Sequence, residues 1–96
     1  MELKQYGQEE IFLEDGNRML LFYYVEHFPE REEEQRYGIH VKKQINGQLV
    51  EQESSGGFSG DEEVAGEVLE IMQRNKITPR VLHEVLYDFL MERICG

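Results

Sequence analysis

The sequence predicts an α+β domain in which an antiparallel sheet of about four strands is followed by two C-terminal helices packed on one face, in the order ββββαα. Three observations predict this fold. Two hairpin signals, Asp15-Gly16 and Asn46-Gly47, each separate a pair of apolar runs in the first half of the chain. In the second half, apolar residues recur at helical spacing in two segments. The pair Thr78-Pro79 divides those segments, as expected at the start of a new helix.

The length and charge of the chain limit its organisation and its partners. Its 96 residues suit one domain. We expect residues 1–96 to form a sheet over about 8–54, a linker over 55–60 and a helical hairpin over 61–94. Twenty acidic and ten basic residues give a formal charge of −10. Nucleic acid and anionic membranes repel such a polyanion, so neither is expected as a partner.

The apolar runs and the single cysteine indicate where the protein resides. The longest apolar run, "MLLFYYV" at residues 19–25, is far shorter than the roughly 20 residues that span a bilayer. The start "MELKQYGQEE" is polar and acidic, unlike a signal peptide. Cys95 has no second cysteine with which to form a disulfide. We therefore expect a cytoplasmic protein.

The first hairpin is predicted over "EEIFLEDGNRMLLFYYVEH". Its strands are expected at Glu9–Leu13 and Arg18–His27, joined by the turn "EDGN". The second strand is apolar at both parities, with Met19, Leu21, Tyr23 and Val25 on one face and Leu20, Phe22 and Tyr24 on the other. This pattern is typical of a central strand that is covered on both faces.

The second hairpin is predicted over "YGIHVKKQINGQLVEQES", because Asn46-Gly47 is the preferred pair for a two-residue type I′ turn. The turn places Ile45 opposite Gln48, Lys43 opposite Val50, Lys42 opposite Glu51 and His40 opposite Glu53. One face is then buried and contains Tyr37, Ile39, Val41, Ile45 and Val50. The other is solvated and pairs opposite charges on His40, Lys42, Glu51 and Glu53.

The Gly-rich segment "SSGGFSGDEE" is interpreted as a linker and helix cap rather than a phosphate-binding loop. It lacks the P-loop spacing and its lysine, and the acids at 61–63 would repel a phosphate. Ser59 and Glu62 match a capping box. The helix that follows, over residues 61–75, carries one apolar stripe formed by Val64, Ala65, Val68, Leu69, Ile71 and Met72.

The last helix carries more apolar surface than one sheet requires. Thr78 is its predicted N-cap, Pro79 its first residue, and Ile77 and Leu82 a hydrophobic staple. Its polar side is too acidic to read DNA. Its apolar face spans roughly 180°, whereas about 100° suffices for packing on a sheet. Either the first helix or a partner buries the surplus. The partner contacts that we predict are Val81, Leu90 and Ile94, with Tyr87 at the rim.

Sites of catalysis are not predicted. His27, His40 and His83 do not show metal-ligand spacing, and the acidic loop at 30–34 lacks the ligand pattern of a calcium site. No nucleophile motif is present. We therefore predict no catalytic, cofactor-binding or metal-binding residue, and expect that the protein is not an enzyme.

Three functional hypotheses follow. The first is a non-catalytic module that binds a protein partner or itself, as a homodimer. The second is a small-molecule-binding domain whose pocket lies between the helices and the aromatic strand residues Phe22, Tyr23 and Tyr24. The third is an acidic decoy that occupies a basic nucleic-acid-binding protein.

Three short motifs carry a resemblance to a known family. They are "YGI" (37–39), "RNKITP" (74–79) and "YDFL" (87–90). The chain resembles, over roughly residues 19–90, a family of short clostridial proteins known only as a domain of unknown function. That family has a Tyr-Gly-Ile-type strand, an acidic helix, an Asn-x-Val/Ile-Thr-Pro corner and a terminal Asp-Phe-Leu helix. The resemblance implies a cytoplasmic bacterial protein of this fold, with no activity, cofactor or functional residue.

Overall fold

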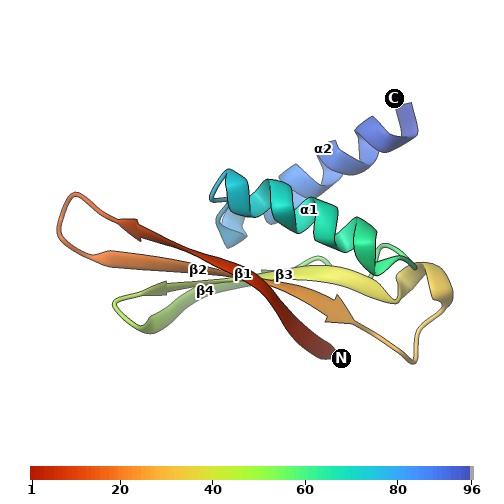
Figure 1. Cartoon of the computed structure of the whole chain (residues 1–96), viewed down its shortest axis with the longest axis horizontal. Coiled ribbons are helices and arrows are strands. Elements are labelled where there is room, and N and C mark those ends of the chain that lie inside the picture. Colours follow the sequence, from red (N-terminus) through yellow and green to blue (C-terminus); the bar gives the residue numbers. More distant parts are fainter. Residues whose placement is uncertain (96) are drawn as a thin grey trace.

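The computed structural model describes residues 1–95, and the side chains of residues 1–93. Strands β1 (Glu2–Phe12), β2 (Arg18–His27), β3 (Tyr37–Ile45) and β4 (Gln48–Ser54) form one antiparallel sheet in the order β1-β2-β3-β4. Helices α1 (Glu62–Arg74) and α2 (Leu82–Cys95) lie on the same side of it (Figure 1). The short 3₁₀ turns η1 (Glu33–Gln35) and η2 (Pro79–Val81) precede β3 and α2. The predicted α+β fold is confirmed.

Strand β1 is longer than predicted. It begins at Glu2 rather than at Glu9, and Glu2 lies opposite His27 at the far end of β2. Its register shifts at Tyr6, which forms a bulge between Gln5 and Gly7. The first half of β1 is an edge segment with little apolar alternation, so backbone pairing with β2 rather than burial of its side chains holds it in the sheet.

The turn of the second hairpin is as predicted, but its register is not. Asn46 and Gly47 both have positive φ, 50° and 86°, and Ile45 lies opposite Gln48. Beyond Gln44 the register shifts by one residue, so that Lys43 lies opposite Glu51. Val50 is the extra residue, and it is 54% exposed rather than buried.

The bulge at Val50 moves every later β4 side chain to the other face of the sheet. His40 therefore lies opposite Ser54, and Val41 opposite Glu53. The predicted pairs His40–Glu53 and Lys42–Glu51 are wrong. Glu51 and Glu53 instead lie on the helical side, where they approach Arg80 (4.0 Å) and His83 (3.6 Å).

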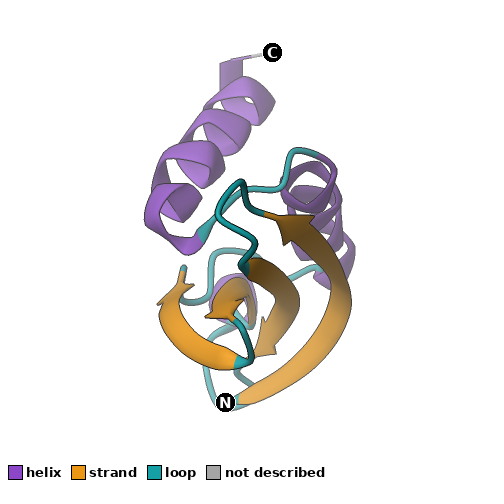
Figure 2. Cartoon of the chain, turned by 90° about the vertical axis from the view of Figure 1, so that its left-hand side faces the viewer, coloured by secondary structure: helices purple, strands orange, loops and turns teal. Residues whose placement is uncertain are grey.

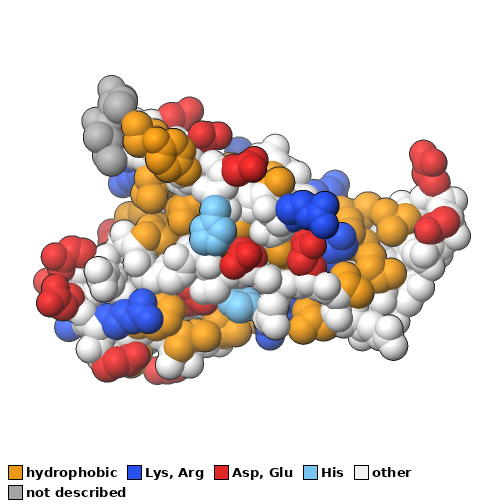
Figure 3. Space-filling model, turned by 180° about the vertical axis from the view of Figure 1, so that it is seen from behind, with side chains coloured by type: hydrophobic (Ala, Val, Ile, Leu, Met, Phe, Trp, Pro, Cys, Tyr) orange, Lys and Arg blue, Asp and Glu red, His pale blue; other side chains and the backbone are white. Residues whose placement is uncertain are grey.

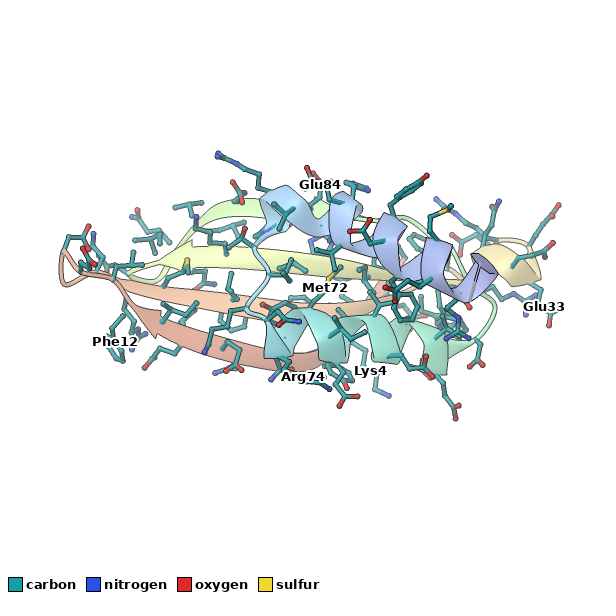
Figure 4. All side chains as sticks on the ribbon, turned by 90° about the horizontal axis from the view of Figure 1, so that it is seen from above. Lys4, Phe12, Glu33, Met72, Arg74 and Glu84 are labelled. Carbon is teal, nitrogen blue, oxygen red and sulfur yellow. The ribbon has the colours of Figure 1, made fainter. Side chains whose placement is uncertain are left out.

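The core lies between the sheet and the two helices. Its buried side chains are Met19, Leu21, Tyr23, Val25, Ile39, Val41, Ala65, Val68, Leu69, Met72, Leu82 and Leu86. Met72 lies over the middle of the sheet (Figure 4). The hydroxyl of Tyr23 donates a hydrogen bond to the carbonyl of Ile77 (2.9 Å), which ties the sheet to the corner between α1 and α2.

The N-cap of α1 lies two residues after the predicted one, and α2 begins three residues after Pro79. Asp61, not Ser59, is the N-cap of α1, and its side chain accepts a hydrogen bond from the Glu63 amide. Ser59 still belongs to extended chain, because it forms a β-bridge with Tyr37. At the corner, Thr78 is an N-cap whose side chain makes no cap hydrogen bond, and buried Pro79 opens η2 rather than α2 itself.

The helices cover only one face of the sheet. Figure 2 shows α1 and α2 together on one side, and no other helix or strand of residues 1–95 lies on the opposite side. The prediction that both faces of β2 are covered is wrong. The second apolar row of β2, formed by Leu20, Phe22 and Tyr24, is therefore only half-buried and lies at the surface.

Candidate interaction surface

The residues predicted as partner contacts differ in their exposure. Val81 is half-buried in η2, which contacts β3 and β4. Tyr87 is 63% exposed on the outer side of α2. Leu90 is half-buried and packs against the core, so part of its apolar surface is covered within the chain. The side chain of Ile94 lies outside the described residues.

A broader surface is the sheet face opposite the helices, which we call the open face. Pairing registers and strand alternation define its members. They are Leu3, Gln5, Gln8, Glu10 and Phe12 of β1, Arg18, Leu20, Phe22, Tyr24 and Glu26 of β2, His40, Lys42 and Gln44 of β3, and Leu49, Gln52 and Ser54 of β4.

The centre of the open face is apolar. Leu20, Phe22 and Tyr24 follow one another on β2, and each is only half-buried. Leu3 and Leu49 add exposed apolar side chains on the two edge strands. Phe12, 73% exposed, extends from the hairpin end of β1 (Figure 4). Figure 3, which views the molecule from behind rather than onto the open face, shows hydrophobic side chains at the surface in several further places.

A buried polar network borders the apolar centre. Glu26 is fully buried and His40 is 8% exposed. His40 contacts Glu26 through Nδ1 (3.2 Å to Oε2) and Gln52 through Nε2 (3.0 Å to Oε1). The Ser54 hydroxyl donates to the same Glu26 oxygen. Both ring nitrogens of His40 therefore lie within hydrogen-bond distance of a side-chain oxygen. Sequence reasoning missed this network because it depends on two strand registers: the β2–β3 pairing places Glu26 near His40, and the bulge at Val50 adds Gln52 and Ser54.

The exposed charges of the open face are also paired. Arg18 Nε lies 3.5 Å from Glu10 Oε2. The Lys42 ammonium lies over the ring of Tyr24, 5.1 Å from its centroid. On this face Arg18 is therefore paired with an acid and Lys42 with an aromatic ring, beside the apolar side chains.

Comparison with known proteins identifies the family. A model described as a family of unknown function, DUF6514, matches residues 3–92, which include most of α2 and all of the sheet except its first residue. The chain belongs to the DUF6514 family. Neither a curated protein nor a solved structure matches it. The predicted resemblance to a domain of unknown function is thus confirmed, while its clostridial origin stays a prediction.

The structure of this DUF6514 protein explains the motif "YGI". Gly38 has no space for a side chain, because a Cβ would lie 2.1 Å from the Gly56 carbonyl oxygen. The linker is held there by Ser55, whose amide donates to the Ile39 carbonyl (3.0 Å) and whose hydroxyl accepts from the Ile39 amide (2.9 Å). Ser55 and Gly56 of the linker therefore pack against β3 and cover one end of the open face. We call this contact the clasp.

The DUF6514 structure also bears on three other features: a metal site, a membrane-spanning helix and a small-molecule pocket. Within the described residues, no group of three or more His, Cys, Asp or Glu could hold a metal ion, and no helix could span a membrane. Tyr23 is buried under the helices, whereas Phe22 and Tyr24 lie on the open face, so the three cannot line one pocket. A cleft of about 270 Å³ lies instead between β1 and α1, lined by Lys4, Gln5, Tyr6, Val25, Glu62, Glu63 and Gly66.

Proposed function

We propose that this DUF6514 protein is a cytoplasmic, bacterial, non-catalytic protein-interaction module, and that its contact surface is the open face. The observation that carries the proposal is the apolar row Leu20, Phe22 and Tyr24, which lies uncovered on a central strand. A sheet that packs on one side only normally alternates apolar and polar residues, with the polar ones outward. An apolar outer row on β2 therefore supports burial by another molecule.

The rigidity of the open face favours binding. Its side chains lie on four hydrogen-bonded strands, and the network around Glu26 fixes His40, Gln52 and Ser54 before any partner arrives. A preformed surface loses less conformational entropy on association than a loop does.

The bonding within the network supports a role without catalysis. Both ring nitrogens of His40 are engaged by side-chain oxygens, and the Ser54 hydroxyl donates to Glu26 rather than to the imidazole. A serine nucleophile requires a hydrogen bond to its base, an arrangement that differs from this one. The network acts instead as a rigid polar border.

Affinity capture tests the proposal. Three tagged baits, wild type, Phe22→Glu and Tyr87→Glu, are exposed to extract of the source cells after circular dichroism has shown that all are folded. We expect wild type and Tyr87→Glu to retain the same protein, and Phe22→Glu to lose it, because a charge is placed in the apolar centre. Loss with Tyr87→Glu alone would assign binding to α2, together with Leu90 and Val81, and refute the open face.

A small-molecule function is the second candidate, and the cleft between β1 and α1 is the observation that favours it. The cleft is mainly apolar, with Val25 and Tyr6 in its lining and Gly66 of α1 at its wall. A ligand there would raise the melting temperature of wild type in a metabolite panel. The rise should vanish in Gly66→Leu, whose side chain would fill the cleft. A flat response of wild type would remove this candidate.

The acidic-decoy hypothesis draws support from the overall charge alone. A basic protein would contact the acidic surfaces away from the open face. Its affinity would then fall steeply as salt screens the attraction. The same capture experiment in low and high salt separates a decoy from an apolar contact, which salt does not weaken.

A further inference from the structure

We infer that the occupant of the open face is a second copy of this chain. The inference rests on the proposed function and specifies its partner. Three properties of the face support it: its charge balance, the chemistry of its polar side chains, and its area.

The open face is electrically neutral on a strongly acidic protein. It contains two acids, Glu10 and Glu26, and two bases, Arg18 and Lys42, so the formal charge of −10 falls on the rest of the molecule. A partner of strong charge, basic or acidic, finds nothing complementary on this face. For two molecules that repel one another everywhere else, the neutral face is the surface on which they can meet.

The polar side chains of the open face are complementary to themselves. Four glutamines lie among its apolar residues: Gln5, Gln8, Gln44 and Gln52. Each amide carries two donor hydrogens and an acceptor oxygen, so a glutamine can pair with another glutamine. A two-fold symmetric contact requires a surface that fits itself, since each residue meets the same patch on the other copy. A neutral, glutamine-rich face with an apolar centre meets this requirement.

The area of the face suits a modest, specific dimer. Strand β2 has 10 residues and the sheet has four strands. At about 3.3 Å per residue and about 4.8 Å between strands, the face measures roughly 600 Å². Two copies would bury roughly 1,200 Å², the low end for specific interfaces. Sheets in such a contact stack about 10 Å apart, close enough for the rings on β2 to interdigitate with those of the other copy.

Sedimentation velocity on the purified chain tests the inference with a matched pair of substitutions. Gln44→Glu adds one negative charge to the open face, whereas Gln48→Glu adds the same charge on the helical side of the neighbouring strand. A second variant, Gln8→Glu, alters an exposed side chain of the open face and so disturbs folding least. Wild type and variants are compared from about 1 to about 500 μM, a range suited to micromolar affinities.

The expected result is a reversible dimer of wild type that Gln44→Glu and Gln8→Glu each weaken by about tenfold or more, since like charges would face one another in a neutral contact. Gln48→Glu should change the dissociation constant by less than about twofold, because its charge remains in solvent. A wild type that stays monomeric throughout overturns the second copy as occupant. Equal effects of Gln44→Glu and Gln48→Glu overturn it as well.

The two proposals, that the open face is the contact surface and that its partner is a second copy, are refuted by different results. If wild type is monomeric but Phe22→Glu still loses a captured protein, the open face binds a different partner and only the second copy is wrong. If wild type dimerises and only Tyr87→Glu dissociates the dimer, the interface lies on α2 and both are wrong.

Discussion

Replacing Tyr23 by Phe should destabilise the fold in a way that depends on pH. Tyr23 is fully buried, and its hydroxyl donates to the Ile77 carbonyl at 2.9 Å. The substitution removes this hydrogen bond and leaves a partly buried carbonyl unpaired. Its cost at neutral pH should be about 1–2 kcal/mol of unfolding free energy. For a domain of this size, the melting temperature should fall by about 4–8 °C per kcal/mol.

Alkaline pH should remove the difference in stability between the two proteins. Burial raises the pKa of Tyr23 above its ordinary value, and the negative charge of Glu9 raises the pKa further. The unfolded chain releases the phenolic proton near pH 10, whereas the folded chain retains it. Above that pH the unfolded state binds fewer protons, so stability falls as pH rises, by up to about 1.4 kcal/mol per unit. Tyr23→Phe lacks this loss and should match wild type near pH 11.

Urea denaturation followed by circular dichroism, at intervals from about pH 8 to 11, measures both effects, and linear extrapolation gives each free energy. Tyr87→Phe is the control, because its ring is mostly solvent-exposed, and it should stay within about 0.5 kcal/mol of wild type. A difference between wild type and Tyr23→Phe that stays constant across this range would refute the reasoning about the buried hydroxyl.

Three further predictions concern the network, the clasp and salt. Glu26→Ala should lower the free energy of unfolding, measured in urea, by about 3 kcal/mol, because it leaves His40 buried without a carboxylate partner. The control Glu10→Ala removes an exposed ion pair and should lower it by less than about 1 kcal/mol. Gly38→Ala should lower the melting temperature through its clash with the linker, whereas Gly66→Ala, whose new Cβ meets only a 3.8 Å contact, should raise it. Raising the salt concentration from about 0.05 to about 0.5 M should strengthen self-association in sedimentation, since it screens the repulsion between two acidic copies; weakening would instead favour the acidic decoy.

The sequence predicted the elements well where local signals were strong. The two-residue turn at Asn46-Gly47 requires two consecutive positive φ angles, which few other residue pairs adopt. The sequence therefore predicted both the turn and its hairpin. The apolar stripes of α1 and the Thr78-Pro79 corner are likewise local patterns. Such features depend on neighbours within a few residues, and the structure places them where they were expected.

The candidate site could not be predicted from the sequence, because it depends on contacts between residues that lie far apart along the chain. The bulge at Val50 leaves no local signal, yet it decides that Gln52 and Ser54, rather than Glu51 and Glu53, share a face with His40. The apolar row on β2 was visible in the sequence, but its pattern is the same whether a helix or a partner covers it. Only the number and placement of the helices show that it is open.

The most direct test of the open face as the contact surface is a dilution series of wild type followed by two-dimensional NMR. Progressive dilution should shift the resonances of Phe22, Lys42 and Gln44, which lie on the open face, and leave those of Tyr87 on α2 unchanged. The same mapping applies to titration with any captured partner. Shifts confined to α2, or spread evenly over both surfaces, would contradict the open face as the contact surface of this DUF6514 protein.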